Sequence, residues 1–168
     1  MNTQLIAKML KQVQQILEGI LSLASTSTES ELHTKALAYL GTDASPNDLA
    51  DDEVGCAESV TAIIKSIDPS EPIILGTWTM YDHMNRSIKF TPVSTPQAGD
   101  IVISPTGESR LGSKRPFVGH VGIVGRNETI MANVSATGKW QSSYTLDTWR
   151  ARWVKLGGYP QLYFRFKK

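Results

Sequence analysis

The helical pattern around the only cysteine of this chain fixes where that residue lies. Five apolar residues recur at the spacing of one α-helical face: Cys56, Val60, Ile63, Ile64 and Ile67. The helix is expected to end at Asp68, because the residue before a proline avoids helical backbone angles. Cys56 then lies in the first turn and faces the core, where the helix dipole lowers the pKa of a thiol. The competing interpretation is a buried cysteine without chemical function.

Length and composition favour one folded domain with an appendage. The chain has 168 residues, of which 40% are hydrophobic, and this is enough for a single core. A single cysteine excludes an internal disulfide. Residues 1–24 carry apolar side chains at helical spacing and predict an amphipathic helix. Residues 25–30 have the composition of a linker, and residues 31–168 are expected to form the compact domain.

The polar face of the N-terminal helix holds only two basic residues, Lys8 and Lys11, too few for binding to a membrane surface. We therefore expect this helix to dock on its own domain or to mediate self-association. No apolar stretch approaches the roughly 20 residues of a membrane span, so stable membrane insertion is not expected.

Charge is divided unevenly between the two halves of the chain. Residues 1–84 hold 4 Lys/Arg against 12 Asp/Glu, a net charge of −8, whereas residues 85–168 hold 13 against 4, a net charge of +9. We expect the halves to lie against each other and neutralise. The alternative is a basic face for an anionic polymer. The basic residues are not clustered densely enough to predict nucleic-acid binding.

The second half has the alternating pattern of an antiparallel sheet. Strands are predicted over residues 100–104, 117–124 and 129–134. Earlier in the chain, a short helix is predicted over residues 31–40, stopped by Gly41.

The turn between the last two predicted strands decides which side chains meet. A hairpin centred between Arg126 and Asn127 places His120 directly opposite Asn133, on the same face of the sheet. The Asn amide would then orient the imidazole of His120 toward a thiol. A shift of one residue in this pairing would put the two side chains on opposite faces.

Four segments, in this order, resemble the NlpC-type and CHAP-type peptidoglycan hydrolases: GCAESV, PQAGDIVIS, GHVGIVG and a further strand with a polar residue. The resemblance covers residues 51–135. It implies an α+β, papain-like fold, in which a catalytic Cys at a helix N-terminus packs on an antiparallel sheet that carries His and Asn. By position, Cys56 resembles the nucleophile, His120 the base and Asn133 the residue that orients the base.

Two further positions bear on this resemblance. Asp100 resembles the acidic residue that opens the first sheet strand, where a structural role is expected. Relatives often carry a Tyr or Gln shortly before the nucleophile, thought to help bind the oxyanion. This chain has acidic residues there instead, so its second oxyanion donor is unassigned.

The acidic residues before Cys56, among them Asp51 and Asp52, have two main interpretations. They cap the helix, or they hold the free amine of a peptide substrate. Trp140 is a further candidate for the substrate site, with core packing as the alternative.

No metal site and no cofactor are predicted. His33 and His83 are expected on a helix surface and in a loop, and no His-Glu-x-x-His pattern indicates a zinc peptidase.

Together these features predict a cysteine peptidase or amidase that hydrolyses amide bonds in bacterial peptidoglycan, in phage lysis or wall penetration. Its partner would be peptidoglycan. The protein would be made in the cytoplasm and act on the wall or periplasm, free or as part of a virion. Two alternatives stay open. One is a non-catalytic wall-binding or virion structural module on the same fold. The other is a wall glycosidase with paired carboxylates such as Glu53 and Glu58.

Overall fold

The computed structural model describes residues 12–14, 30–45, 55–106 and 118–168, and its architecture is α+β, as the sequence predicts. Six strands form one sheet in the order β1-β6-β2-β3-β4-β5, and each pair of neighbours is antiparallel. The predicted N-terminal helix and linker lie outside the described residues, apart from the helical residues 12–14 and Ser30. In the described part of the chain, no helix is long and apolar enough to cross a bilayer.

The described ranges contain the helices α2 (Glu31–Ala38), α3 (Cys56–Lys65), α4 (Thr77–Arg86) and α5 (Leu146–Trp149). The strands are β1 (Phe90–Pro92), β2 (Ile101–Ser104), β3 (His120–Val124), β4 (Thr129–Val134), β5 (Lys139–Thr145) and β6 (Leu162–Phe166). A 3-10 turn, η1 (Arg126–Glu128), joins β3 to β4, and a π-helix, η2 (Arg150–Leu156), continues α5.

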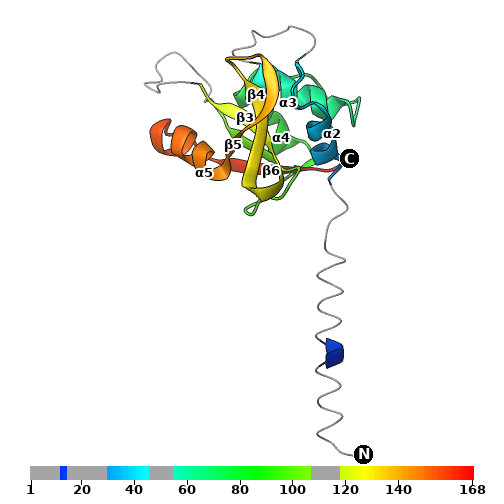
Figure 1. The fold of residues 1–168 in the computed structure, drawn as a ribbon. Helices are drawn as coiled ribbons and strands as arrows, with labels where there is room; N and C mark the ends of the chain where they lie inside the picture. The colour runs from blue at the N-terminus through cyan, green and yellow to red at the C-terminus, as the bar shows by residue number, and fades with distance from the viewer. Residues whose placement is uncertain (1–11, 15–29, 46–54, 107–117) are drawn as a thin grey trace, which may run out of the picture.

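Helices lie on both faces of the sheet (Figure 1), and the two faces support two separate cores. On the helix face, α2, α3 and α4 cover the sheet with their apolar side chains. On the aromatic face, α5 and η2 cover it with Trp149 and Trp153. Side chains of β3 alternate between the two, since Val121 and Ile123 belong to the helix-face core and Val124 to the aromatic-face core. The position of a residue along β3 thereby determines which face of the sheet its side chain points to.

Helix α3 begins at Cys56, as predicted, and its apolar stripe packs on β3 and β4. Its helical hydrogen bonding extends to the N–H of Asp68, which donates to Ile64 O at 2.9 Å, just before Pro69. Helix α2 ends two residues before its predicted end. Gly41 follows with φ of 82°, a left-handed conformation that glycine adopts without a steric penalty.

Several elements were not predicted, namely α4, α5, η2, β1, β5 and β6. The predictions for two histidines were also wrong. His83 lies on α4 rather than in a loop, and its Nε2 is 2.8 Å from Glu71 Oε2. His33 lies on α2, but its side chain is buried in the domain rather than exposed on the helix surface.

The predicted register of the β3–β4 hairpin was wrong by one residue. Gly125 N–H donates to Thr129 O at 2.7 Å and Val124 pairs with Ile130, so the turn is centred on Asn127. The loop has three residues rather than two, because Asn127 and Glu128 both adopt positive φ, at 53° and 59°.

Continued along the strands, the observed register places Asn133 opposite Val121 instead of His120. Gly122 agrees with this register, because a Cβ added there would lie 3.2 Å from the Cβ of Ala132. His120 and Asn133 consequently point to opposite faces of the sheet.

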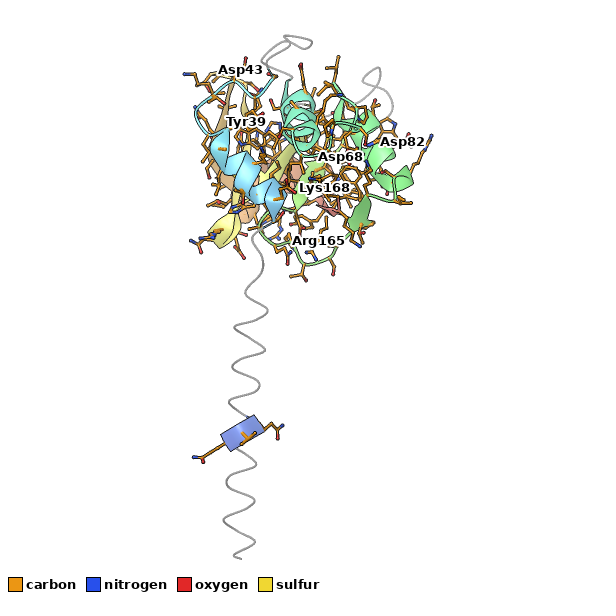
Figure 2. All side chains as sticks on the ribbon, turned by 90° about the vertical axis from the view of Figure 1, so that its right-hand side faces the viewer. Tyr39, Asp43, Asp68, Asp82, Arg165 and Lys168 are labelled. Atoms are coloured by element: carbon orange, nitrogen blue, oxygen red, sulfur yellow. The ribbon has the colours of Figure 1, made fainter. Side chains whose placement is uncertain are left out.

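Ion pairs join the acidic first half of the chain to the basic second half. Lys89 Nζ lies 2.5 Å from Asp68 Oδ2 and 3.1 Å from Glu71 Oε1. A further ion pair between the two halves places Lys168 Nζ 3.8 Å from Glu31 Oε1 (Figure 2 labels Asp68 and Lys168). These contacts agree with the expectation that the two halves lie against each other.

The Asp68–Lys89 pair predicts an acid-dependent loss of stability. Hydrogen bonds from Lys89 and Ser70 lower the pKa of Asp68 from 3.8 to about 2. Between these two pH values the unfolded chain binds more protons than the folded one. The contribution of the Asp68 carboxylate to the free energy of unfolding is therefore complete above about pH 4 and declines toward pH 2. We expect the difference in unfolding free energy between wild type and Asp68→Asn to be constant above pH 4 and to shrink at lower pH, in urea titrations.

The control for this experiment is Asp147→Asn. The Asp147 side chain is 85% exposed, and its partner Arg150 lies three residues further along the same helical segment. An exposed local ion pair of this kind contributes little to stability. This variant should differ little from wild type at any pH. An Asp68→Asn difference that stays constant down to pH 2 would contradict the assigned role of the Asp68 carboxylate.

Candidate active site

Cys56 lies in the first turn of α3 with its thiol directed into the helix-face core, where it is 7% exposed. Burial raises the pKa of this thiol to about 11, although hydrogen bonds from the backbone of Val121, Ala57 and Cys56 itself act in the opposite direction. The helix N-terminus is present as predicted, but its effect on the thiol is smaller than the cost of desolvating a thiolate. Cys56 is therefore a neutral thiol in this conformation.

His120 is the first residue of β3, and its ring lies in an aromatic stack on the other side of the sheet. The imidazole is 4.8 Å from the ring of Trp153 at an interplanar angle of 10°, and 5.3 Å from the ring of Trp149. Tyr144 closes the stack edge-on at 5.8 Å. Burial, together with the positive charge of Arg152, lowers the pKa of His120 to about 3, so the imidazole is neutral at ordinary pH.

The thiol and the imidazole therefore lie at the same end of β3 but on opposite faces of the sheet. The backbone of Val121 contacts the Cys56 thiol, and His120 immediately precedes Val121 in the chain. His120 pairs with Ser104, whose hydroxyl accepts a hydrogen bond from Trp149 on the aromatic face. Within the described residues, no hydrogen bond reaches Nε2 of His120, which is buried. Cys56 and His120, the predicted pair, both lie next to Val121, but their side chains face opposite cores.

Asn133 lies on the face of the thiol rather than on that of the imidazole. It pairs with Trp140 on β5 and is 2% exposed. Its predicted task of orienting His120 is incompatible with this placement, because β-strand side chains alternate and the register differs by one residue. Asn133 instead comes from the strand position opposite Val121, whose backbone contacts Cys56.

The predicted substrate residues do not form a described site. Trp140 is completely buried, and its Nε1 donates to Ala36 O at 3.0 Å, so it fastens α2 to β5 and has no surface left for a substrate. That prediction was wrong, and the core-packing alternative applies. Asp51 and Asp52 lie outside the described residues.

Asp100 has the structural role that was expected of it. Its two carboxylate oxygens accept hydrogen bonds from Nε and a terminal nitrogen of Arg165, each at 2.8 Å, and one also accepts from the N–H of Gln97. Figure 2 labels Arg165, on β6 beside β2. This two-point contact ties β6 to the start of β2 and thereby supports the strand that pairs with β3.

The residues that the sequence analysis missed are the aromatic partners of His120. Trp149 donates to Ser104 Oγ at 3.0 Å and Trp153 donates to Val118 O at 3.3 Å, so both indoles are fixed by hydrogen bonds as well as by stacking. Their spacing of four residues in TWRARW is a helical signal that could have placed both on one face. Nothing in that spacing indicates that their partner is a histidine.

No family model matches this chain, and no curated protein matches it either. Within the described ranges, no group of three or more His, Cys, Asp or Glu side chains is placed to hold a metal ion.

The state of the thiol can be measured by its reactivity. Because its pKa of about 11 exceeds the ordinary value of 9.0, we expect about 100-fold less thiolate at pH 8 than in a free cysteine, and burial slows access further. Alkylation of the folded protein by iodoacetamide should therefore be at least about 100-fold slower than alkylation of the same protein in urea, followed by mass spectrometry. Rapid alkylation at pH 7 would instead indicate a preformed thiolate–imidazolium pair.

Proposed function

We propose that this protein is a cysteine-dependent hydrolase of amide bonds in bacterial peptidoglycan, with Cys56 as the nucleophile. One observation carries the proposal: the thiol, at the first turn of α3, contacts the backbone of Val121, the neighbour of His120. The order of segments that resembles the NlpC-type and CHAP-type hydrolases supplies the substrate class. A role in phage lysis or in penetration of the wall is part of the same proposal.

The proposed reaction starts from two neutral groups. His120 takes the thiol proton as a general base while the sulfur of Cys56 attacks the amide carbonyl. The carbon–sulfur bond forms, the carbon–nitrogen bond breaks, and protonated His120 gives its proton to the leaving amine. Water, deprotonated by His120, then attacks the thioester carbonyl. The carbon–sulfur bond breaks, the acid is released, and His120 returns the proton to the sulfur of Cys56. The N–H of Cys56 is one donor to the oxyanion, and the amide of Asn133, on the face of the thiol, is the proposed second donor.

This reaction requires the imidazole to leave the aromatic face. Because strand pairing fixes the face of each side chain, His120, the first residue of β3, has to unpair from Ser104 for this change. In the observed conformation His120 is stacked on Trp149 and Trp153, and no hydrogen bond joins it to Cys56 among the described residues. A buried ring nitrogen without a partner costs about 1–3 kcal/mol, which partly offsets the loss of stacking when the ring moves. The observed conformation is therefore proposed to be a resting state.

A second candidate is a non-catalytic wall-binding or virion structural module on the same fold. The observation that favours it is the separation of Cys56 and His120, together with pKa values of about 11 and about 3 that keep both groups neutral. The glycosidase alternative gains no support, since Glu58 is completely buried and Glu53 lies outside the described residues.

The deciding experiment measures release of soluble fragments from purified peptidoglycan. We expect Cys56→Ala and His120→Ala to lower the rate by at least about 1,000-fold, because the nucleophile and the base are each lost. Mass spectrometry of the products should show newly exposed amine and carboxyl ends.

The matched control is His83→Gln, which removes a histidine on α4 that takes no part in the proposed reaction. It should retain full activity, and thermal unfolding should confirm that each variant is folded. If Cys56→Ala released fragments as fast as the wild type, the proposal of a cysteine-dependent hydrolase would be contradicted. Absence of any activity, with wall binding intact, would favour the module. Reducing sugars released in the presence of a thiol reagent would indicate a glycosidase.

A further inference from the structure

A groove of about 360 Å³ lies where β1 ends and β6 begins, beside the second half of α4. Tyr81 and Asn85 of α4 line one side, and Pro92, Ser94 and Gln161 line the other. None of the described residues that line it carries a charge, in contrast to the neighbouring cavity on α4, where Asp82, His83 and Arg86 lie. Its volume falls in the range of sites for small ligands.

The walls of the groove offer flat apolar surfaces that are held in place. The ring of Tyr81 packs edge-on against Phe164 at 6.1 Å and is tilted against Trp78 at 5.6 Å. Phe164 is buried beneath it, and Pro92 is exposed on the opposite strand. Rigid aromatic and prolyl surfaces bind the apolar face of a ligand at little cost in side-chain entropy.

The groove also offers hydrogen-bonding groups that the fold does not use. Nε2 of Gln161 is buried and has no hydrogen-bond partner among the described residues. Asn85 is an exposed residue that lines the groove, and its Nδ2 donates to Tyr81 O at 2.9 Å. A buried donor without a partner costs about 1–3 kcal/mol, and a ligand acceptor that reaches it recovers that cost.

We propose that this groove binds a neutral, N-acetylated sugar unit of a glycan. A sugar ring presents an apolar face to Tyr81 or Pro92 and hydroxyl groups at its edge to the side-chain amides. An acetamido carbonyl is the acceptor that Gln161 Nε2 lacks, and the buried amide must turn toward the groove to reach it. The described residues of the groove offer no charged group with which an anionic or cationic ligand could form an ion pair.

A peptide fits this groove less well than a sugar. A peptide added to the edge of the sheet would pair with β1, but β1 has three residues and ends in Pro92, which has no N–H. The next N–H, that of Val93, already donates to Tyr163 O at 3.1 Å. Neither Pro92 nor Val93 therefore offers a backbone N–H to an added peptide strand.

The choice of an N-acetylated sugar rests on the proposed wall substrate, whereas the preference for a neutral carbohydrate follows from the groove itself. Binding at this site does not require Cys56, which lies on α3 and does not line the groove. The test therefore uses full-length protein carrying Cys56→Ala, so that binding is measured without hydrolysis.

The experiment titrates this protein with N,N′-diacetylchitobiose, with cellobiose and with an alanine tripeptide, followed by amide chemical shifts in NMR. We expect diacetylchitobiose to shift the residues of the groove, cellobiose to bind more weakly, and the tripeptide not to bind. Gln161→Leu should lower the affinity for diacetylchitobiose by at least about tenfold, which is the loss expected for one buried hydrogen bond. Asn85→Ala, at an exposed position, is a second variant that should weaken binding without affecting the fold.

Thr79→Val, in the neighbouring cavity on α4, is the matched control and should leave binding unchanged. No binding of either sugar would overturn the proposal, as would binding that is unaffected by both Gln161→Leu and Asn85→Ala, or binding of the tripeptide alone. Equal binding of cellobiose and diacetylchitobiose would overturn the assignment of an N-acetylated unit. A failure of the proposed hydrolase would appear separately, in the activity of the protein that retains Cys56.

Discussion

The antiparallel pairing of β3 with β2 on one side and β4 on the other is the constraint on which the rest of this structure depends. Ser104 pairs with His120 and Ile101 with Ile123, without a bulge between them. This pairing fixes the direction of each side chain in β3, because successive residues of a strand point to opposite faces. Val121 is thereby directed to α3, and His120 to the tryptophans of α5 and η2.

The two faces create two different environments for the groups that were expected to react together. On the helix face, Cys56 is surrounded by the apolar side chains of the larger core, so the neutral thiol is favoured. On the aromatic face, the indoles of Trp149 and Trp153 exclude water from His120, so the neutral imidazole is favoured. Both shifts have the same cause, which is that burial penalises the charged form. An active pair would need the imidazole on the thiol's side of β3.

Much of the fold could be predicted from local sequence patterns. The apolar stripe of α3 and the alternation in β2, β3 and β4 are repeated signals, and these elements were found within a few residues of their predicted bounds. The register of the hairpin could not be predicted, because Asn127 and Glu128 adopt left-handed backbone angles without being glycine. One residue of error there moved Asn133 from the partner of His120 to the face of Cys56. The helix α4 was missed because few of its residues are apolar: its buried face consists of Thr77, Met80 and Met84.

His120 and Cys56 face opposite cores in the resting protein, and an isotope-edited NOESY spectrum can test this placement. The ring protons of His120 should show cross-peaks to the indole protons of Trp149 and Trp153. The β protons of Cys56 should show cross-peaks to Val121 and none to the ring of His120. Cross-peaks between the His120 ring and the side chains of Cys56 or Asn133 in the free protein would contradict the account.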